Sequence, residues 1–206
     1  MYQGNFPSVL IPDNRQTVIA LGIDPGTRHL GWGIVRAEAN QLRHVAHGVI
    51  DASPTLSLAH RLALIDTALH EVIATYKPAV GSVETLFFHK DAQAAAKLGH
   101  ARGVVLLALA RANVDVAEYA PAHVKMVITG KGNADKRQVA MMIRALLALD
   151  EEPRSDAADA LALAVTHCRR APLDLALRAR ATDAHIVPGS PLARLARGRK
   201  RPSFAR

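Results

Sequence analysis

The feature that most constrains the fold of this chain is an apolar, β-branched run that ends in a single carboxylate. Residues 18–23 read Val-Ile-Ala-Leu-Gly-Ile, Asp24 follows, and Pro25-Gly26 then turns the chain toward a second apolar run at residues 30–35. Two such runs joined by a Pro-Gly turn predict a β-hairpin. A carboxylate beside a buried strand loses hydration and needs a partner, of which a bound cation is the strongest. Asp also commonly initiates turns, and the hairpin alone favours neither role for Asp24.

The rest of the pattern predicts an α/β layered domain with a five-stranded mixed sheet flanked by helices. Three hairpin-linked strands come first, and helical crossovers then alternate with single strands, which is the order expected of a mixed sheet. Apolar spacing and turn residues predict the further strands at 43–50, 79–83 and 114–119, and the helices at 57–76, 91–113, 120–128, 134–149 and 155–167.

Charge and composition divide the chain into three parts. Residues 1–16 read as a flexible N-terminal extension, 17–170 as one domain with a single core, and 171–206 as a basic tail that is disordered without a partner. The tail holds eight Lys or Arg and two Asp, a net charge of +6 out of +8 for the whole chain. Such a tail attracts polyanions without discriminating between them.

The cysteine count and the lengths of the apolar runs also exclude several protein classes. One cysteine, Cys168, rules out an internal disulfide framework and is typical of the reducing cytoplasm, where we expect this protein to act. The apolar run at residues 103–110 is far shorter than the ~20 residues of a membrane-spanning helix, and residues 1–16 lack the pattern of a signal peptide. We therefore expect no membrane partner.

Four carboxylates recur at positions where apolar surroundings demand a counter-charge. Glu84 ends the strand at 79–83 as Asp24 ends the first one, and Asp156 and Asp159 open the last helix. Their i, i+3 spacing puts the last two on one helical face, about 4.5 Å apart along the axis. The helix dipole also favours an acid at Asp156, whereas Asp159 lies among alanines and leucines. Gathered together, the four would suit two hard divalent cations of the kind that drive phosphoryl displacement.

An ordered set of motifs in this chain resembles the RuvC family of Holliday-junction resolvases. The match runs from about residue 18 to 169, and the order of the motifs is far more specific than any one of them. The motifs are Gly-Ile-Asp-Pro-Gly-Thr at 22–27, Gly-Trp-Gly at 31–33, Val-Glu-Thr-Leu-Phe at 83–87, Lys-Leu-Gly-His-Ala-Arg-Gly at 97–103, Ala-Pro-Ala-His-Val-Lys at 120–125 and Asp-Ala-Ala-Asp-Ala-Leu-Ala at 156–162.

The resemblance implies a ribonuclease-H-like fold and a magnesium-dependent endonuclease that makes symmetric cuts at a four-way DNA junction in recombination and repair. It implies two Mg²⁺ ions per active site, with Mn²⁺ as a substitute, and catalytic, metal-binding acids at Asp24, Glu84, Asp156 and Asp159. Its partners would be junction DNA, a second copy of the chain and, as a further candidate, a branch-migration helicase complex. In some relatives His stands at the position of Asp156.

The resemblance also assigns residues to DNA binding. The junction-probing aromatic falls on Phe87, where an exposed ring can stack on unpaired bases, although one of Phe87 and Phe88 is expected to pack in the core. Two functional lysines fall on Lys125 and Lys136, which could neutralise phosphates, whereas an arbitrary lysine is usually a solvated surface charge. Lys90 and Arg28 are weaker candidates for the same role.

Small residues form a row on the helix predicted at 91–113. Ala95, Gly99 and Gly103 lie at four-residue spacing, which allows close approach of another helix either in the core or across a dimer interface. The spacing leaves both open, and the resemblance favours the dimer interface. His167 and Cys168 have no ligand spacing around them and read as structural, not as zinc ligands.

Two rival functions use the same residues. A Gly-Ile-Asp-x-Gly-Thr hairpin also cradles phosphates in actin-like sugar kinases and ATPases, but those proteins enclose a nucleotide between two such domains and this chain has room for one. A catalytically inactive junction-binding module is the other rival. The presence of all four acids argues against it.

Overall fold

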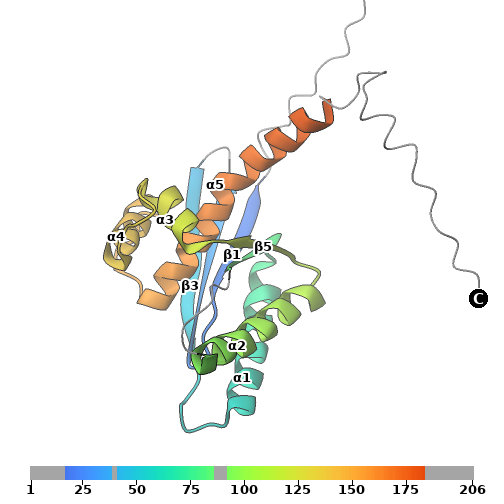
Figure 1. Cartoon of the computed structure of the whole chain (residues 1–206), viewed down its shortest axis with the longest axis vertical. Coiled ribbons are helices and arrows are strands. Elements are labelled where there is room, and N and C mark those ends of the chain that lie inside the picture. Colours follow the sequence, from blue (N-terminus) through green and yellow to red (C-terminus); the bar gives the residue numbers. More distant parts are fainter. Residues whose placement is uncertain (1–16, 39–40, 86–91, 184–206) are drawn as a thin grey trace, which may run out of the picture. The chain divides into compact units, whose positions relative to one another are not determined.

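The computed structural model describes residues 17–38, 41–85 and 92–183, and side chains only as far as Arg170. Five strands and five helices follow one another along these residues (Figure 1). In chain order they are β1 (Val18–Asp24), β2 (His29–Glu38), β3 (Gln41–Asp51), α1 (Leu58–Tyr76), β4 (Val80–Glu84), α2 (Ala92–Arg111), β5 (Asp115–Tyr119), α3 (Pro121–Thr129), α4 (Lys136–Leu146) and α5 (Ser155–Asp183). The chain divides into two compact units, Met1–Arg169 and Arg170–Arg206, and the first contains the whole sheet.

The strands form one mixed sheet in the order β3-β2-β1-β4-β5, so the predicted fold class is confirmed. β1 pairs antiparallel with β2, which pairs antiparallel with β3, whereas β4 lies parallel to both β1 and β5. In the parallel pair, Ile23 lies opposite Val83. The next residue of each strand, Asp24 and Glu84, therefore stands at the same edge of the sheet on neighbouring strands.

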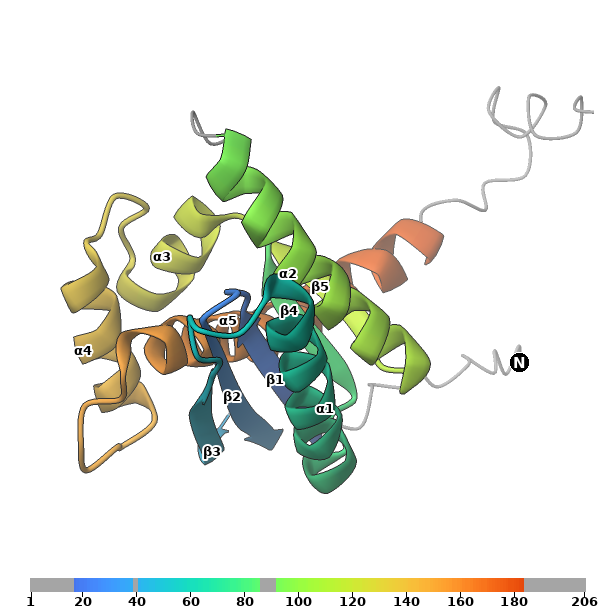
Figure 2. The ribbon, with the colours of Figure 1, turned by 90° about the horizontal axis from the view of Figure 1, so that it is seen from below.

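Helices cover both faces of the sheet and enclose two apolar cores. Figure 2 shows α1 and α2 side by side on one face, with α5 beyond the strands. Side chains of α1 and α2 pack with Leu21, Ile23 and Val83 in one core. On the other face, residues of α3, α4 and α5 pack with Ala20 and Val80. The two cores use alternate residues of β1 and β4, as the strand pleat requires.

Two glycines let α5 lie directly against β1 and β2. A Cβ added at Gly22 would lie 1.8 Å from the carbonyl oxygen of Ala160, and one at Gly31 would lie 1.9 Å from that of Asp156. No other residue type fits at this distance. The close approach brings the first two turns of α5 onto the strand that carries Asp24.

Two predicted helix ends are wrong. α5 continues to Asp183 instead of ending near His167, since residues 168–183 are rich in Leu, Ala and Arg, which have strong helix propensity. The helix continues through Pro172, so residues 171–183 of the tail, predicted to be disordered, are helical. α4 ends at Leu146, earlier than predicted, because Ala148 adopts a left-handed backbone with φ of 49°. The Arg144 guanidinium donates to carbonyls beyond that end, those of Leu149 and Asp150.

None of the helices in the described ranges is long and apolar enough to cross a membrane.

Candidate active site

Strand pleating aims the two strand-end carboxylates toward α5. Leu21 and Ile23 point into the core beneath α1 and α2, so Asp24, the next residue after Ile23, points to the opposite face. The same alternation applies in β4, where Val83 lies in that core and Glu84 follows it. Both carboxylates therefore face the side of the sheet on which α5 lies.

α5 brings the other two acids to the same edge of the sheet. Asp156 and Asp159 lie in its first two turns, which the glycine contacts hold against β1 and β2. Lys136, the first residue of α4, donates from its Nζ to Oδ2 of Asp159 at 3.0 Å. A capping box between Asp135 and Gln138 fixes the start of α4 and with it the base of the Lys136 side chain.

Residues of β1, β4, α3, α4 and α5 line a cavity of about 230 Å³ at this edge of the sheet. Three of the four acids line it, together with Lys125 and Lys136, whereas Asp156 does not. The rest of the lining is apolar. The lining residues are the charged Asp24, Glu84, Asp159, Lys125 and Lys136, and the apolar Pro121, Val124, Val139, Ala162 and Leu163.

The electrostatics of the cavity show a shortage of positive charge. Burial, followed by the negative charges of Asp159, Glu84 and Asp156, raises the pKa of Asp24 from 3.8 to about 7, although Lys136 lowers it. The hydrogen bond and charge of Asp159 raise the pKa of Lys136. All three other acids thus act on Asp24, including Asp156, which lies outside the cavity lining.

This donor set fits a hard divalent cation. All four acids offer oxygen, which such cations prefer, and Asp24 would regain its charge beside one. The Lys136 ammonium already stands as a cation against Asp159. Within the described part of the chain, no three His, Cys, Asp or Glu side chains are yet close enough together to hold a metal ion, so binding would have to draw the carboxylates inward.

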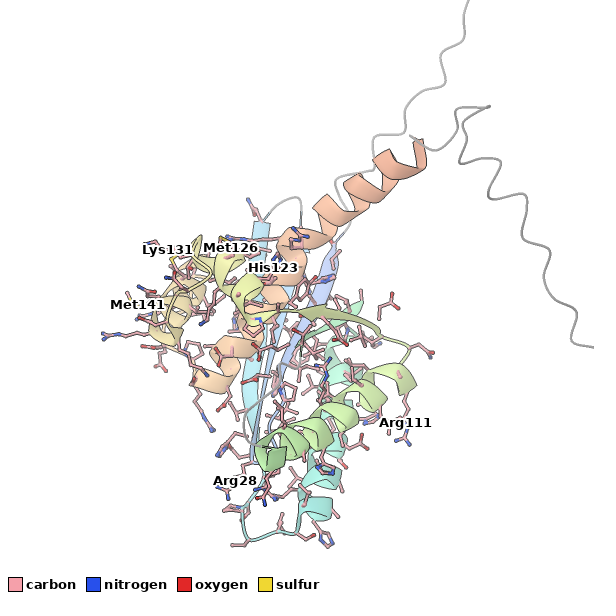
Figure 3. All side chains as sticks on the ribbon, in the orientation of Figure 1. Arg28, Arg111, His123, Met126, Lys131 and Met141 are labelled. Carbon is pink, nitrogen blue, oxygen red and sulfur yellow. The ribbon has the colours of Figure 1, made fainter. Side chains whose placement is uncertain are left out.

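The remaining predicted residues fall in different places. Phe87 and Lys90 lie outside the described residues. Arg28 is exposed in the turn before β2, and it does not line the cavity (Figure 3). The side chain of His167 bonds through Nδ1 to the hydroxyl of Tyr119 at 2.8 Å, and burial raises the pKa of Cys168 to about 12. The bond of His167 to Tyr119 and the burial of Cys168 are consistent with structural roles for these two residues.

Sequence reasoning missed two arginines beside the candidate site. Arg102 in α2 is buried and contacts the main chain of Glu84. Arg154, just before α5, donates to both carboxylate oxygens of Asp51, at 2.6 and 3.0 Å, and His29 also bonds to Asp51. Arg102 lies within the motif at 97–103, so the motif marked it without indicating a role, whereas no local pattern marks Arg154.

Comparison with known proteins agrees with this geometry. The family model described as crossover junction endodeoxyribonuclease RuvC matches residues 20–167. The chain belongs to the RuvC family. A RuvC protein of Sorangium cellulosum is 53% identical over 180 residues, which cover 87% of this chain and 96% of that protein. A RuvC protein of Rhodopseudomonas palustris is 49% identical over 156 residues, or 76% of this chain and 90% of the relative.

Solved structures give the same result for the fold. Thermus thermophilus RuvC in complex with a Holliday junction substrate is 39% identical and superposes with a TM-score of 0.72, over 76% of this chain and 96% of that one. The yeast mitochondrial Holliday junction resolvase is 15% identical with a TM-score of 0.57, over 79% and 85% of the two chains, and shares the fold alone. The predicted RuvC resemblance and ribonuclease-H-like fold are both confirmed.

Proposed function

We propose that this RuvC-family chain resolves four-way (Holliday) DNA junctions in recombination and repair, by metal-dependent hydrolysis of phosphodiester bonds at two symmetric positions. The observation that carries the proposal is the carboxylate of Asp24, buried at a strand end and surrounded by three further acids and Lys136. A relative of known structure, Thermus thermophilus RuvC, was solved with a Holliday junction substrate. The same edge of the sheet in this chain offers the acids and lysines that such chemistry needs.

The four acids would hold the metal ions, two Mg²⁺ per active site with Mn²⁺ as a substitute. When bound, a pair of such ions activates the attacking water and stabilises charge on the leaving oxygen. Asp24 and Glu84 hold the strand side of the site, while Asp159 and Asp156 hold the α5 side. Because the backbone of α5 lies directly against Gly22 and Gly31, movement of the side chains, with the backbone kept in place, would bring the carboxylates together around the ions.

The lysines would bind the DNA phosphate beside the acids. Lys125 and Lys136 line the same cavity as Asp24 and Glu84, so their ammonium groups can offset phosphate charge near the cut. Phe87 would stack on bases at the branch point, with Lys90 and the exposed Arg28 on neighbouring phosphates. The basic tail at 171–206 would add affinity that does not depend on DNA sequence, and the nuclease domain would comprise residues 17–170.

A homodimer would supply two such sites. The row of small residues on α2 is not used in the core of this chain, because a Cβ added at Gly99 or Gly103 would meet nothing within 4 Å. Leu107, one helical turn further on, is 48% exposed. An isologous contact through this face would relate the two sites by a two-fold axis, which suits paired symmetric cuts. A branch-migration helicase complex would be a further partner. The protein would act in the cytoplasm.

A labelled synthetic four-way junction tests the function. Wild-type protein with Mg²⁺ or Mn²⁺ should give paired symmetric nicks, and Asp24→Asn and Asp159→Asn should abolish the nicks while junction binding persists. Lys131→Met, a change in the exposed loop after α3, serves as a control that should cut normally. Junction binding without nicks under either metal would instead establish an inactive binding module.

A further inference from the structure

Arg102 is the least exposed charged residue within the described ranges, with 7% of its surface exposed. A guanidinium taken out of water needs partners that replace its hydration. Its Nη2 lies 2.7 Å from Oε2 of Glu118 on β5, and its Nη1 donates to the carbonyl oxygen of Glu84. One side chain of α2 thus joins β5 to the end of β4.

The guanidinium of Arg102 and the carboxylate of Glu84 lie on opposite faces of the sheet. Val83 points into the core beneath α2, and Glu118 is its register partner on β5, so Glu118 lies on the α2 face as well. Glu84, the next residue, points to the α5 face. Arg102 therefore holds the main chain of Glu84 from one side, while the carboxylate projects into the candidate active site on the other.

The peptide unit after Glu84 has both of its polar groups bonded. Its carbonyl accepts from Arg102, and its N–H, which belongs to Thr85, donates to the carbonyl of Tyr119 at 2.9 Å. Because a peptide unit is planar, two bonds on opposite sides fix its orientation. That orientation sets the backbone angle of Glu84 and hence the direction in which its side chain leaves the strand.

We propose that Arg102 is a positioning residue for the reaction, which fixes the carboxylate of Glu84 for binding the catalytic cation. This proposal rests on the function proposed above. Arg102 acts through the backbone and does not touch the reacting atoms. Residues that orient metal ligands typically affect metal affinity or activity by ~10–100-fold when they are replaced.

The shape of the guanidinium is what the role requires. Two nitrogens of one planar group reach two acceptors, Glu84 O and Glu118 Oε2, which a single ammonium cannot reproduce. Arg102→Lys keeps the positive charge but loses the planar group whose two nitrogens reach both acceptors. Arg102→Met removes both the charge and that group. Glu118→Gln keeps an oxygen acceptor for Nη2, so it leaves the contact with Glu84 intact.

Mn²⁺ binding by the full chain without DNA provides the test, measured by titration calorimetry. We expect Arg102→Lys and Arg102→Met to weaken Mn²⁺ binding by about 10-fold or more. The Mn²⁺ concentration that half-saturates junction cleavage should rise in parallel. Glu118→Gln should change the Mn²⁺ affinity and the half-saturating Mn²⁺ concentration by less than Arg102→Lys does. Arg111→Met, which removes an exposed arginine from the end of the same helix, is the matched control and should change neither.

Circular dichroism and thermal unfolding of each variant identify those that fold. A folded Arg102→Lys protein that binds Mn²⁺ as tightly as wild type, and cuts at the same Mn²⁺ concentration, would overturn the positioning role. Since Mn²⁺ binding is measured without DNA, wild-type protein that binds Mn²⁺ but cuts no junction would contradict only the proposed function. Wild-type protein that binds no Mn²⁺ would overturn both.

Discussion

The Lys136 ammonium lies 3.0 Å from the carboxylate of Asp159, and this pair joins the start of α4 to the second turn of α5. The pair stands at the edge of a cavity that also contains Asp24 and Glu84. A positive side chain therefore already offsets part of the charge of the four acids, and its contribution can be measured through Asp24, whose pKa the Lys136 charge lowers.

Replacing Lys136 by Met should raise the pKa of Asp24 further above about 7, since the lysine charge lowers that pKa in wild type. Cleavage requires ionised acids, so the rising limb of the pH–rate profile should move to higher pH at low Mg²⁺. NMR titration of the Asp24 carboxyl carbon in metal-free protein measures the shift directly. Lys131→Met is the control, and a Lys136→Met protein with an unshifted Asp24 titration would contradict the assignment.

Asp24 should make the metal-free protein less stable as pH rises from about 4 to about 7. The folded protein keeps the Asp24 proton up to its raised pKa of about 7, whereas the unfolded chain releases it near 3.8, so unfolding releases a proton in this range. The full shift corresponds to roughly 4 kcal/mol above pH 7. Asp24→Asn should therefore raise the thermal unfolding temperature at pH 8 much more than at pH 4.

Mg²⁺ extends the same experiment. The ion should stabilise wild type at pH 8 and should stabilise Asp24→Asn far less, because the variant lacks the buried charge that the ion neutralises. Equal Mg²⁺-induced increases in unfolding temperature for the two proteins would show that Asp24 does not bind the ion.

Gly22→Ala should destabilise the fold by about 3 kcal/mol or displace α5. The added methyl group would lie 1.8 Å from the carbonyl oxygen of Ala160, which is backbone and cannot rotate away. Urea unfolding measures the loss, and Gly132→Ala, whose Cβ would be 3.4 Å from its nearest neighbour, is the control. A Gly22→Ala protein of wild-type stability that still cuts junctions would show that the close approach is not required.

Asp51→Asn should loosen the start of α5. Arg154 and His29 hold the pKa of Asp51 down to about 2, so their contacts are made by the ionised carboxylate and are lost only as the pH falls from about 3.8 through about 2. At neutral pH, amide hydrogen exchange at residues 155–159 should be faster in the variant. Asp115→Asn, at the exposed start of β5, is the comparison, and equal exchange rates in the two proteins would exclude an anchoring role.

Gly103→Arg should convert the proposed dimer to a monomer. The position is open in the single chain, so a long side chain is tolerated by the fold but prevents another helix from approaching. Light scattering with size-exclusion chromatography measures the mass, and thermal unfolding checks that the variant folds. A Gly103→Arg protein with the dimer mass would place the interface elsewhere on the surface.

Local sequence was enough to predict the sheet and the positions of the acids along it. Apolar runs that end at Asp24 and Glu84 must place those carboxylates at strand ends, since side-chain alternation and turn residues act over a few positions. The i, i+3 spacing of Asp156 and Asp159 likewise predicted that they share one face of α5, because helix periodicity also acts over a few positions. The ends of α4 and α5 were predicted wrongly, because Ala148 adopts a left-handed backbone and helix propensity carries α5 through Pro172.

What the sequence determined by itself was therefore the set of elements and the acid on each of them. Only the tertiary structure decided how deeply Asp24 is buried, that Lys136 pairs with Asp159, and that Asp156 stands outside the cavity lining. It also showed that the Arg102 side chain donates a hydrogen bond to the main-chain carbonyl of Glu84. The physical reason is that burial and electrostatic coupling depend on contacts between residues far apart in the chain, and strand and helix periodicity contains no information about those distances.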